Sequence, residues 1–298
     1  MIHIFHHHNV TGDYLIIHLQ VVTTKHATPN HYITGKTKPP IIRTTEQYHQ
    51  TFNNMTSKSE LENNLRFFSS IPHMETSIGN ENITNHIRDT WKSYGFEVEE
   101  PEYEVLMSLP QEDNPNKVSI INDDTKEVDY EIVGQLNVTA GGLQGNDVFK
   151  YKPFLAYSPN GTVEGELVYA NLGSEKDFQE LEKRNISVKG KIVMFKDLFG
   201  EVRNAKLRGA VGAIVYPDPI THALEGIQPG NTYPQKPWMP PNGVQSKSLS
   251  NILGDNKTPL LPSKRGMYRR PLNQTMLSDL IPAQSISYED ASILLRVE

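Results

Sequence analysis

Histidines are the residues of this chain that could hold a catalytic metal, and ten of the eleven precede residue 90. They occupy positions 3, 6, 7, 8, 18, 26, 31, 49, 73, 86 and 222. A two-metal hydrolytic centre needs imidazole and carboxylate ligands around ions about 3.5–4 Å apart, and a further carboxylate to accept a proton from water. Because only His222 follows His86, residues 91–298 supply too few imidazoles, and we predict no zinc site there.

The other histidines suggest little chemistry. His3, His6, His7 and His8 could bind a transition metal as a flexible cluster near the N-terminus. His222 stands near Asp218, and we interpret it as a histidine of a surface loop, not as a metal ligand.

Other catalytic devices are also missing from the sequence. The chain has no cysteine, which excludes a thiol nucleophile, a disulfide and a cysteine-ligated zinc ion. It has no Gly-x-Ser-x-Gly turn of the serine hydrolase type. The acidic pairs Glu99-Glu100 and Asp123-Asp124 are adjacent, so their side chains point apart in a strand or turn. We therefore predict no catalytic residue, no cofactor and no activity for this chain alone.

The stretch from Gly165 to Pro219 predicts the α/β core that would position any site. Its three short apolar runs are typical of buried strands joined by crossover helices, and they cover residues 167–169, 192–195 and 213–216. Ser174 and Asp177 form a capping-box pattern before a helix whose apolar stripe includes Phe178 and Leu181. A second, shorter helix would place Val202, Ala205 and Leu207 on one face.

The flanking segments have different patterns. Residues 1–56 lack a sustained period and predict a disordered or loosely ordered tail. Two amphipathic helices follow, the first capped by Ser57 or Ser59 and the second ending at Gly95. Their apolar stripes comprise Leu61, Leu65 and Phe68 in the first, and Ile83, Ile87, Trp91 and Tyr94 in the second. Residues 97–109 and 117–133 predict strands, and residues 218–282 predict long surface loops along one edge of the sheet.

The composition limits the class of binding partner and the cellular location of the chain. The formal charge of −6 over 298 residues disfavours nucleic acid, which requires a basic face. Lys264, Arg265, Arg269 and Arg270 form a basic cluster that we interpret as a solvated loop. The apolar run of residues 14–22 is too short to span a bilayer, and no signal or membrane anchor is evident.

N-glycosylation sequons favour a secreted or cell-surface chain. Asn-x-Ser/Thr occurs more often than chance predicts, and an Asn- and Thr-rich composition is the alternative explanation. We predict sugar attachment at Asn82, Asn137, Asn160, Asn185, Asn256 and Asn273. Two further sequons begin at Asn9 and Asn54.

Three motifs of the α/β stretch resemble the protease-associated domain of the glutamate carboxypeptidase II and transferrin receptor group. They are Gly165-Glu-Leu-Val-Tyr, the Lys-Gly-Lys-Ile-Val of residues 189–193, and Gly209-Ala-Val-Gly-Ala-Ile-Val-Tyr-Pro-Asp-Pro219. Ile71-Pro-His73, Trp91-Lys-Ser-Tyr-Gly95, residues 103–110 and residues 288–295 extend the resemblance over roughly residues 61–295.

The resemblance implies a fold and a domain division. The fold would be α/β (α+β), a protease-associated domain with a β-sandwich or open barrel and flanking helices, after a helical segment of an incomplete peptidase domain. Residues 57–109 would be a helical segment and strand that belong to the peptidase domain in relatives. Residues 110–285 would be the protease-associated domain, and residues 286–298 would begin a truncated peptidase domain.

The resemblance also implies site residues and partners. Relatives carry two zinc ions in their peptidase domain and contact substrate through an arginine in a Phe-Arg-Gly motif. Here the loop reads Asp197-Leu-Phe-Gly200, which leaves Arg203 as the nearby candidate. Backbone oxygens of Thr258 and Leu261 would correspond to calcium ligands. The implied partners are the peptidase and C-terminal domains, a peptide substrate, and a second copy in the full-length protein.

Three interpretations remain open from the sequence. The first is the protease-associated portion of a glutamate carboxypeptidase II-like peptidase, which would wall one side of a substrate cleft. The second is a stand-alone protein-binding module, and the third is a transferrin receptor-like ectodomain fragment. Zinc ligands beyond Glu298 would separate the first from the third.

Overall fold

The computed structural model describes residues 1–6, 8–9, 14–18, 21–23, 44–111, 113–139, 148–197 and 202–296. The chain forms two compact units. Unit 1 comprises Met1–Ile17, Tyr103–Val138 and Lys150–Glu298, and unit 2 comprises His18–Glu102 and Thr139–Phe149. The predicted mixture of helices and several sheets is confirmed.

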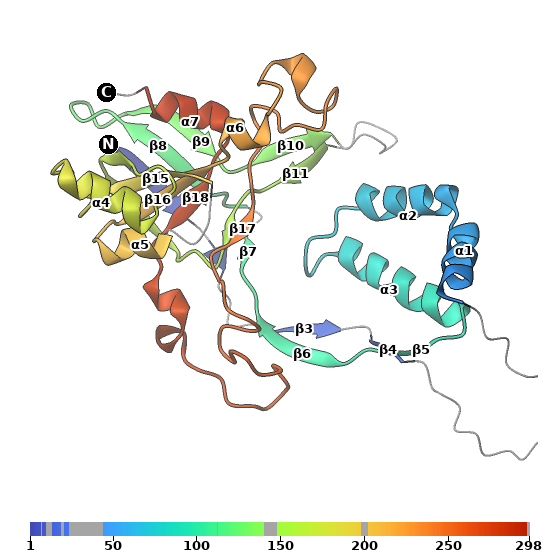
Figure 1. Ribbon diagram of the computed structural model, residues 1–298. Helices are drawn as coiled ribbons and strands as arrows, with labels where there is room; N and C mark the ends of the chain where they lie inside the picture. Colours follow the sequence, from blue (N-terminus) through green and yellow to red (C-terminus); the bar gives the residue numbers. More distant parts are fainter. Residues whose placement is uncertain are drawn as a thin grey trace, which may run out of the picture. The chain divides into compact units, whose positions relative to one another are not determined.

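A four-stranded parallel sheet lies at the centre of unit 1 (Figure 1). Its order is β14 (Leu167–Tyr169), β15 (Ile192–Lys196), β16 (Gly212–Tyr216) and β18 (Ala283–Ser285). Three of these strands coincide with the predicted apolar runs, whereas β18 lies beyond the predicted core. Every residue of β16 is buried, as expected for a strand covered on both faces.

Two helices cover one face of this sheet. They are α4 (Glu175–Lys183) and α5 (Val202–Leu207), which contribute Phe178, Val202 and Ala205 to a core shared with Val193 and Phe195. The predicted Ser174–Asp177 capping box is present. Leu207, expected on the apolar stripe of the second helix, is instead 69% exposed.

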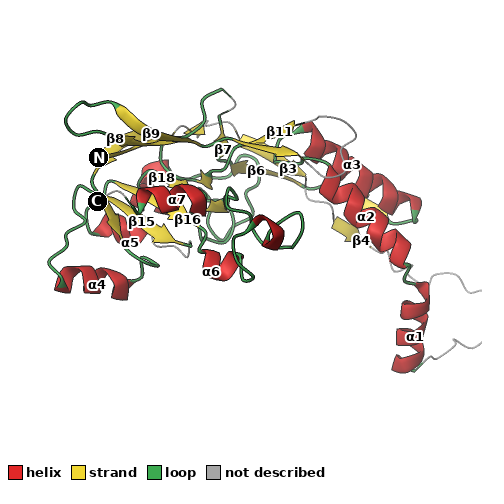
Figure 2. Cartoon of the chain, turned by 90° about the horizontal axis from the view of Figure 1, so that it is seen from above, coloured by secondary structure: helices red, strands yellow, loops and turns green. Residues whose placement is uncertain are grey.

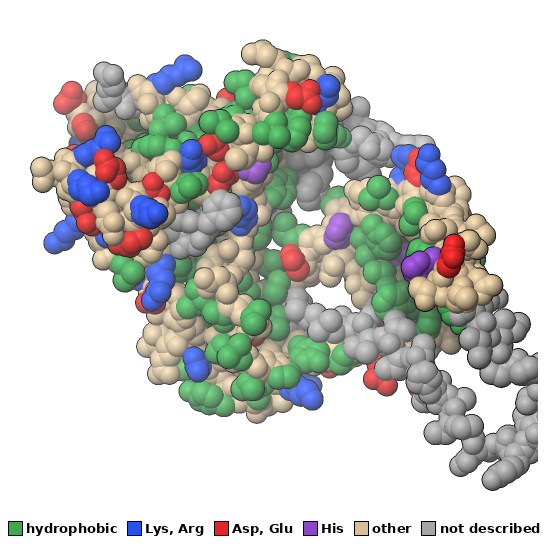
Figure 3. Space-filling view, viewed as in Figure 1, with side chains coloured by type: hydrophobic (Ala, Val, Ile, Leu, Met, Phe, Trp, Pro, Cys, Tyr) green, Lys and Arg blue, Asp and Glu red, His purple; other side chains and the backbone are tan. Residues whose placement is uncertain are grey.

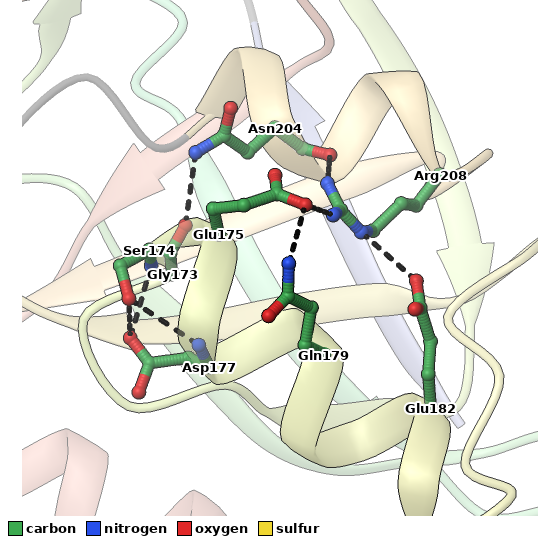
Figure 4. A network of polar contacts seen from close by, with 8 residues as sticks. All are labelled: Gly173, Ser174, Glu175, Asp177, Gln179, Glu182, Asn204 and Arg208. Carbon is green, nitrogen blue, oxygen red and sulfur yellow. Dashed lines mark hydrogen bonds and ion pairs between the residues drawn. The ribbon is translucent and has the colours of Figure 1, made fainter.

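Polar contacts fix α4 against α5 (Figure 4). The Arg208 guanidinium, just after α5, bonds to Glu175 Oε1 at 2.6 Å and to Glu182 Oε1 at 3.3 Å. It also lies 4.6 Å from the centre of the Phe178 ring. Asn204 Nδ2 donates to the Gly173 carbonyl at 3.2 Å. These contacts hold the edge of the Phe178 core in place.

An antiparallel sheet packs on the other face (Figure 2). Its order is β13 (Gly161–Gly165), β1 (Ile2–His6), β8 (Lys117–Ile121) and β9 (Val128–Val133). Ile2 and Ile4 are buried against Ile192 and Ile214. The expectation of a loose tail over residues 1–56 is corrected for Ile2–His6, because these residues pair with strands on both sides.

The helix α7 (Tyr288–Leu294) closes this second core, and a hydrogen bond links it to β9. Tyr130 Oη donates to Asp290 Oδ1 at 2.9 Å. Burial, followed by this hydrogen bond to a carboxylate, raises the pKa of Tyr130 to about 12.

We expect the fold to lose stability at alkaline pH as the Tyr130 phenol ionises. The folded protein favours the neutral phenol. The stabilisation that this gives is complete below the unfolded tyrosine pKa of about 10 and is lost as pH rises through about 12. Urea unfolding from pH 9 to 12 should show a smaller fall in the free energy of unfolding for Tyr130→Phe than for wild type. Equal slopes for the two proteins would contradict this assignment.

Further short strands pair outside these two sheets. The paired short strands are β2 (His8–Asn9) with β7 (Leu109–Pro110), β3 (Tyr14–His18) with β6 (Glu102–Leu106), β10 (Leu136–Thr139) with β11 (Val148–Tyr151), and β12 (Leu155–Ala156) with β17 (Lys247–Ser248). The helix α6 (Pro219–His222) and the 3-10 turns Pro229–Asn231, Leu272–Gln274 and Met276–Asp279 interrupt the predicted loop region.

The described residues of unit 2 form the helices α1 (Thr45–Met55), α2 (Lys58–Ser70) and α3 (Ile78–Ser93), and the strand pair β4 (Val21–Thr23) and β5 (Glu97–Glu99). The two predicted helices are confirmed, and Ser57 caps the first. The helix α1 lies within the predicted tail, so that expectation is corrected here too. No helix in the described part of the chain is long and apolar enough to cross a membrane.

The predicted apolar stripes of unit 2 are only partly covered. Ile83 is buried, and the centres of the Phe67 and His86 rings lie 4.3 Å apart with their planes tilted by 38°. Leu61, Leu65 and Tyr94 are exposed. The helices therefore leave apolar side chains in solvent.

Candidate functional site

A polar cluster forms where β15 and β16 end. Asp197 directly follows β15, and Asp218 comes two residues after β16. Ligands of open α/β sheets bind at the carboxyl ends of the strands. Asp197 is 7% exposed and has a φ of +56°, a conformation that non-glycine residues adopt rarely. This edge is therefore the candidate functional site of unit 1.

Asp197 accepts hydrogen bonds from three groups of the next turn. His222 Nε2 lies 2.8 Å from Asp197 Oδ1, and the Asp218 amide donates to the same oxygen at 3.3 Å. The Thr221 hydroxyl donates to Oδ2 at 3.3 Å. The carboxylate thereby fixes α6 against the end of β15, because three bonds converge on one buried group.

Asp218 pairs with a lysine of the neighbouring strand. Its Oδ2 lies 3.1 Å from Lys196 Nζ, and its Oδ1 accepts from the Ile220 amide at 3.0 Å, which caps α6. The hydrogen bond to Asp218 raises the pKa of Lys196, so the lysine stays charged at neutral pH.

His222 is a partly accessible member of the cluster. Its side chain is 28% exposed, and Gln245 Nε2 lies 2.9 Å from its Nε2. If Nε2 carries the proton that bonds to Asp197, Nδ1 is an acceptor, with Gln245 Nε2 at 3.4 Å. The sequence-based interpretation as a surface loop histidine is thus revised, since Asp197 and Gln245 hold the ring in a half-buried position.

The cluster is a hydrogen-bonded network at the carboxyl end of the parallel sheet. Within the described ranges, no group of three or more His, Cys, Asp or Glu side chains could hold a metal ion. The cluster can donate and accept hydrogen bonds at the sheet edge.

Arg203, the predicted substrate-binding residue, lies on α5 and forms an ion pair with Asp279. Its Nη2 lies 3.4 Å from Asp279 Oδ2, and its side chain is 56% exposed. The loop residues 198–200 that replace the family motif lie outside the described residues. The structure thus shows an exposed, paired guanidinium, and substrate contact by Arg203 stays a prediction.

The predicted calcium segment is engaged in turns, and its two predicted ligand residues differ in burial, because Leu261 is 58% exposed. Thr258 is 3% exposed, and its carbonyl accepts from the Leu261 amide at 3.1 Å. The nearby Asp255 carboxylate accepts from the Leu106 and Lys257 amides. Calcium takes six to eight oxygen ligands, typically including carboxylates. Thr258 and Leu261 alone do not fit such an ion, so further ligands would have to come from elsewhere, and this site also stays a prediction.

Most predicted glycosylation sites whose side chains are described are exposed. They are Asn82, Asn160, Asn185 and Asn273. The side chains of Asn137 and Asn9 lie outside the described residues. Asn256 is a correction, because it is 3% exposed and its Oδ1 accepts from the Ser250 hydroxyl at 3.0 Å. A glycan has no room at that position in this fold.

We expect glycans at the exposed sequons and none at Asn256. Asn185→Gln and Asn273→Gln should each lower the apparent mass of the chain, expressed through a secretory pathway, by one glycan. Asn256→Gln should leave the mass unchanged, and glycosidase digestion with intact-mass measurement distinguishes the outcomes. A glycan on Asn256, or none at any sequon, would contradict this reading.

Residues 163–252, which include β14, β15, β16 and the polar cluster, match the PA domain family. The chain carries a PA domain. It is 35% identical over 246 residues to mouse (Mus musculus) aminopeptidase NAALADL1, covering 80% of this chain and 32% of that protein. It is 34% identical over 241 residues to the Caenorhabditis briggsae glutamate carboxypeptidase 2 homolog, covering 78% and 31%.

Human (Homo sapiens) transferrin receptor protein 2 is 32% identical over 147 residues, covering 48% of this chain and 17% of that protein. The resemblance inferred from the motifs is thereby confirmed. This chain spans about a third of the length of NAALADL1 and of the glutamate carboxypeptidase 2 homolog.

The sequence missed the Asp197–His222 pair. The two residues are 25 positions apart, and no local motif joins them. The available signal was positional, since polar residues that follow neighbouring parallel strands meet at one edge of the sheet. Lys196, the last residue of β15, belongs to the cluster for the same reason, whereas Gln245 reaches it from the loop before β17.

Proposed function

We propose that this chain is the non-catalytic N-terminal and protease-associated portion of a glutamate carboxypeptidase 2-like metallopeptidase. The observation that carries the proposal is the identity of 35% over 246 residues, which spans 80% of this chain and 32% of NAALADL1. In a full-length relative this portion would wall one side of the substrate cleft and shape access to it. The hydrogen-bonding groups around Asp197 and His222 are suited to contact a peptide substrate there.

The domain division follows from the same proposal. Residues 110–285 would be the protease-associated domain, with its two packed sheets as a β-sandwich or open barrel. Residues 57–109 and 286–298 would belong to the peptidase domain. The exposed Leu61, Leu65 and Tyr94 support this division, because amphipathic helices are stabilised by burying such a face.

The cofactors, partners and location of the full-length protein are part of the proposal. Two zinc ions would be held by the peptidase domain, and a calcium ion would be held by carboxylates of that domain together with backbone oxygens of Thr258 and Leu261. The partners would be that domain, a C-terminal domain, a peptide and, in the full-length protein, a second copy. The exposed sequons support an extracellular or cell-surface location.

A receptor-like ectodomain is the second candidate. The similarity to transferrin receptor protein 2 over 147 residues favours it. Sequencing the transcript beyond the codon for Glu298 separates the two candidates. A Gly-His-x-Asp strand end with later Glu and His codons supports the peptidase.

Metal analysis and a peptidase assay on the full chain test the proposal. The full chain is required because Ile2 and Ile4 belong to the core. A variant with His6, His7 and His8 replaced by glutamine removes adventitious binding by the N-terminal histidines. We expect no stoichiometric zinc in this variant and no hydrolysis of acidic dipeptides by either protein. Two zinc ions per chain together with hydrolysis would overturn the proposal.

A further inference from the structure

A cavity of about 260 Å³ opens beside the C-terminal half of α4. Its floor is apolar and includes Phe178, Leu181 and Val188. Phe178 and Val188 are 1% and 5% exposed, so the cavity reaches the edge of the core that α4 and α5 share with the parallel sheet. Pockets that hold drug-sized ligands measure about 300–1,000 Å³. This cavity is slightly smaller and suits a group with a single ring.

The rim of the cavity is polar and is not cationic overall. Arg208 lines the rim, and its guanidinium is bonded to Glu175 and Glu182 (Figure 4). The Ser187 hydroxyl accepts from the Lys189 amide at 3.2 Å and can still donate one hydrogen bond. One guanidinium beside two carboxylates gives this group a net negative charge. The rim therefore disfavours an anion and suits a neutral occupant that forms hydrogen bonds.

A rigid turn places a glycosylation sequon at this rim. The helix α4 ends in a Schellman motif, in which the Ile186 amide donates to the Leu181 carbonyl and the Asn185 amide donates to the Glu182 carbonyl, both at 2.9 Å. Asn185 has the left-handed φ of +57° that the motif requires at this position. Leu181 and Ile186, the apolar pair that such a motif brings together, both line the cavity. Because its neighbours on both sides line the cavity, Asn185 lies at its edge.

The face of unit 1 that carries α4 has the character of a solvent-exposed surface. Figure 3 shows acidic and basic side chains interspersed over this part of the chain. The cores of protein interfaces, in contrast, are depleted in charged residues. The helix α7, at the end where the chain would continue into the peptidase domain, belongs to the core on the opposite face of the parallel sheet. We therefore expect the cavity beside α4 to face solvent in the full-length protein as well.

We propose that the first N-acetylglucosamine of a glycan on Asn185 occupies this cavity. The proposal rests on the glycosylation of Asn185 predicted above and goes beyond it, because it assigns the sugar a binding site. The C–H face of the sugar ring and its acetamide methyl group would lie on Leu181 and Ile186. Its hydroxyl groups would bond to Glu182 and Ser187. An apolar side chain of a partner protein would have to pass the glycan to reach the same cavity, so the attached sugar is favoured.

Release of glycans from the native chain by peptide:N-glycosidase tests the proposed site. The full chain is expressed through a secretory pathway, and mass spectrometry follows the conversion of Asn to Asp at each sequon. A contact that must open before the enzyme acts, and that is worth about 1.4 kcal/mol, slows release roughly tenfold. Release at Asn185 should therefore be roughly tenfold slower than at Asn273, which is also exposed. After denaturation the two rates should be equal.

A variant of the cavity wall separates this binding site from general crowding around the glycan. Ile186→Ser keeps the sequon and removes an apolar side chain that is already 39% exposed, so the fold should tolerate it. It should raise the rate of release at Asn185 to that at Asn273. Leu207→Ala removes an exposed leucine of α5 and should leave both rates unchanged.

The urea midpoint of unfolding provides a second readout. An endoglycosidase trims each glycan to a single N-acetylglucosamine, and the same sequence made without glycosylation is the reference. The trimmed chain should have the higher midpoint, and this gain should shrink in Ile186→Ser and persist in Asn273→Gln. Equal native release at Asn185 and Asn273, a rate at Asn185 that Ile186→Ser leaves unchanged, or the absence of a glycan on Asn185 would overturn the proposal.

Discussion

Replacing Phe178 with alanine is expected to lower the free energy of unfolding by about 3–5 kcal/mol. Phe178 is 1% exposed, and its ring meets the Phe195 ring edge-to-face at 6.3 Å. The Arg208 guanidinium lies 4.6 Å from the ring centre and is held there by Glu175 and Glu182. Truncation would remove both contacts and leave a cavity that the parallel sheet cannot easily fill.

Urea unfolding followed by circular dichroism measures this effect. Leu207→Ala is the matched control, since Leu207 also lies on a helix of this face but is 69% exposed. It should change the free energy of unfolding by less than about 0.5 kcal/mol. A similar loss for both variants would show that the Phe178 core does not carry the stability assigned to it.

The parallel core was predictable because its signals are local. Ile192–Phe195 and Gly212–Tyr216 are uninterrupted apolar runs, and strands buried on both faces require that pattern. The Ser174–Asp177 capping box needs only four consecutive residues, so it too could be recognised. The fourth strand could not, because Ala283–Ser285 has one apolar residue and is defined by pairing with β16.

The polar cluster shows what sequence leaves undetermined. Asp197, Asp218 and His222 were each visible as residue types that could do chemistry. Their partners depend on which strands are adjacent, because Lys196 on β15 reaches Asp218 after β16. Exposure of the unit 2 stripes was equally unpredictable. Periodicity identifies the apolar face of α2, whereas coverage of Leu61 and Leu65 depends on what packs there.

Ile4 gives the clearest contrast between local pattern and tertiary structure. The first residues read as a tail because His3, His6 and the following histidines obscure any alternation. In the fold, Ile4 pairs with Val163 on one side and Val118 on the other, and it is 0% exposed. Its packing on β16 is close, since a Cβ built on Gly212 would lie 3.1 Å from Ile4 Cδ1.

Ile4→Ala is therefore expected to cost about 2–5 kcal/mol of the free energy of unfolding, and Ile4→Val about 0.5–1.5 kcal/mol. Replacing a residue of a loose tail would leave the free energy of unfolding unchanged. A packed Ile4 and an Ile4 in a loose tail therefore predict losses that differ by more than the error of a urea titration. Ile220→Ala, at a position that is 76% exposed, should leave the free energy of unfolding within about 0.5 kcal/mol of wild type. An Ile4→Ala variant as stable as that control would contradict the assignment of β1 to the sheet. The graded series from valine to alanine distinguishes loss of packing from loss of the strand itself, because valine keeps the β-branched side chain that pairs well within a sheet.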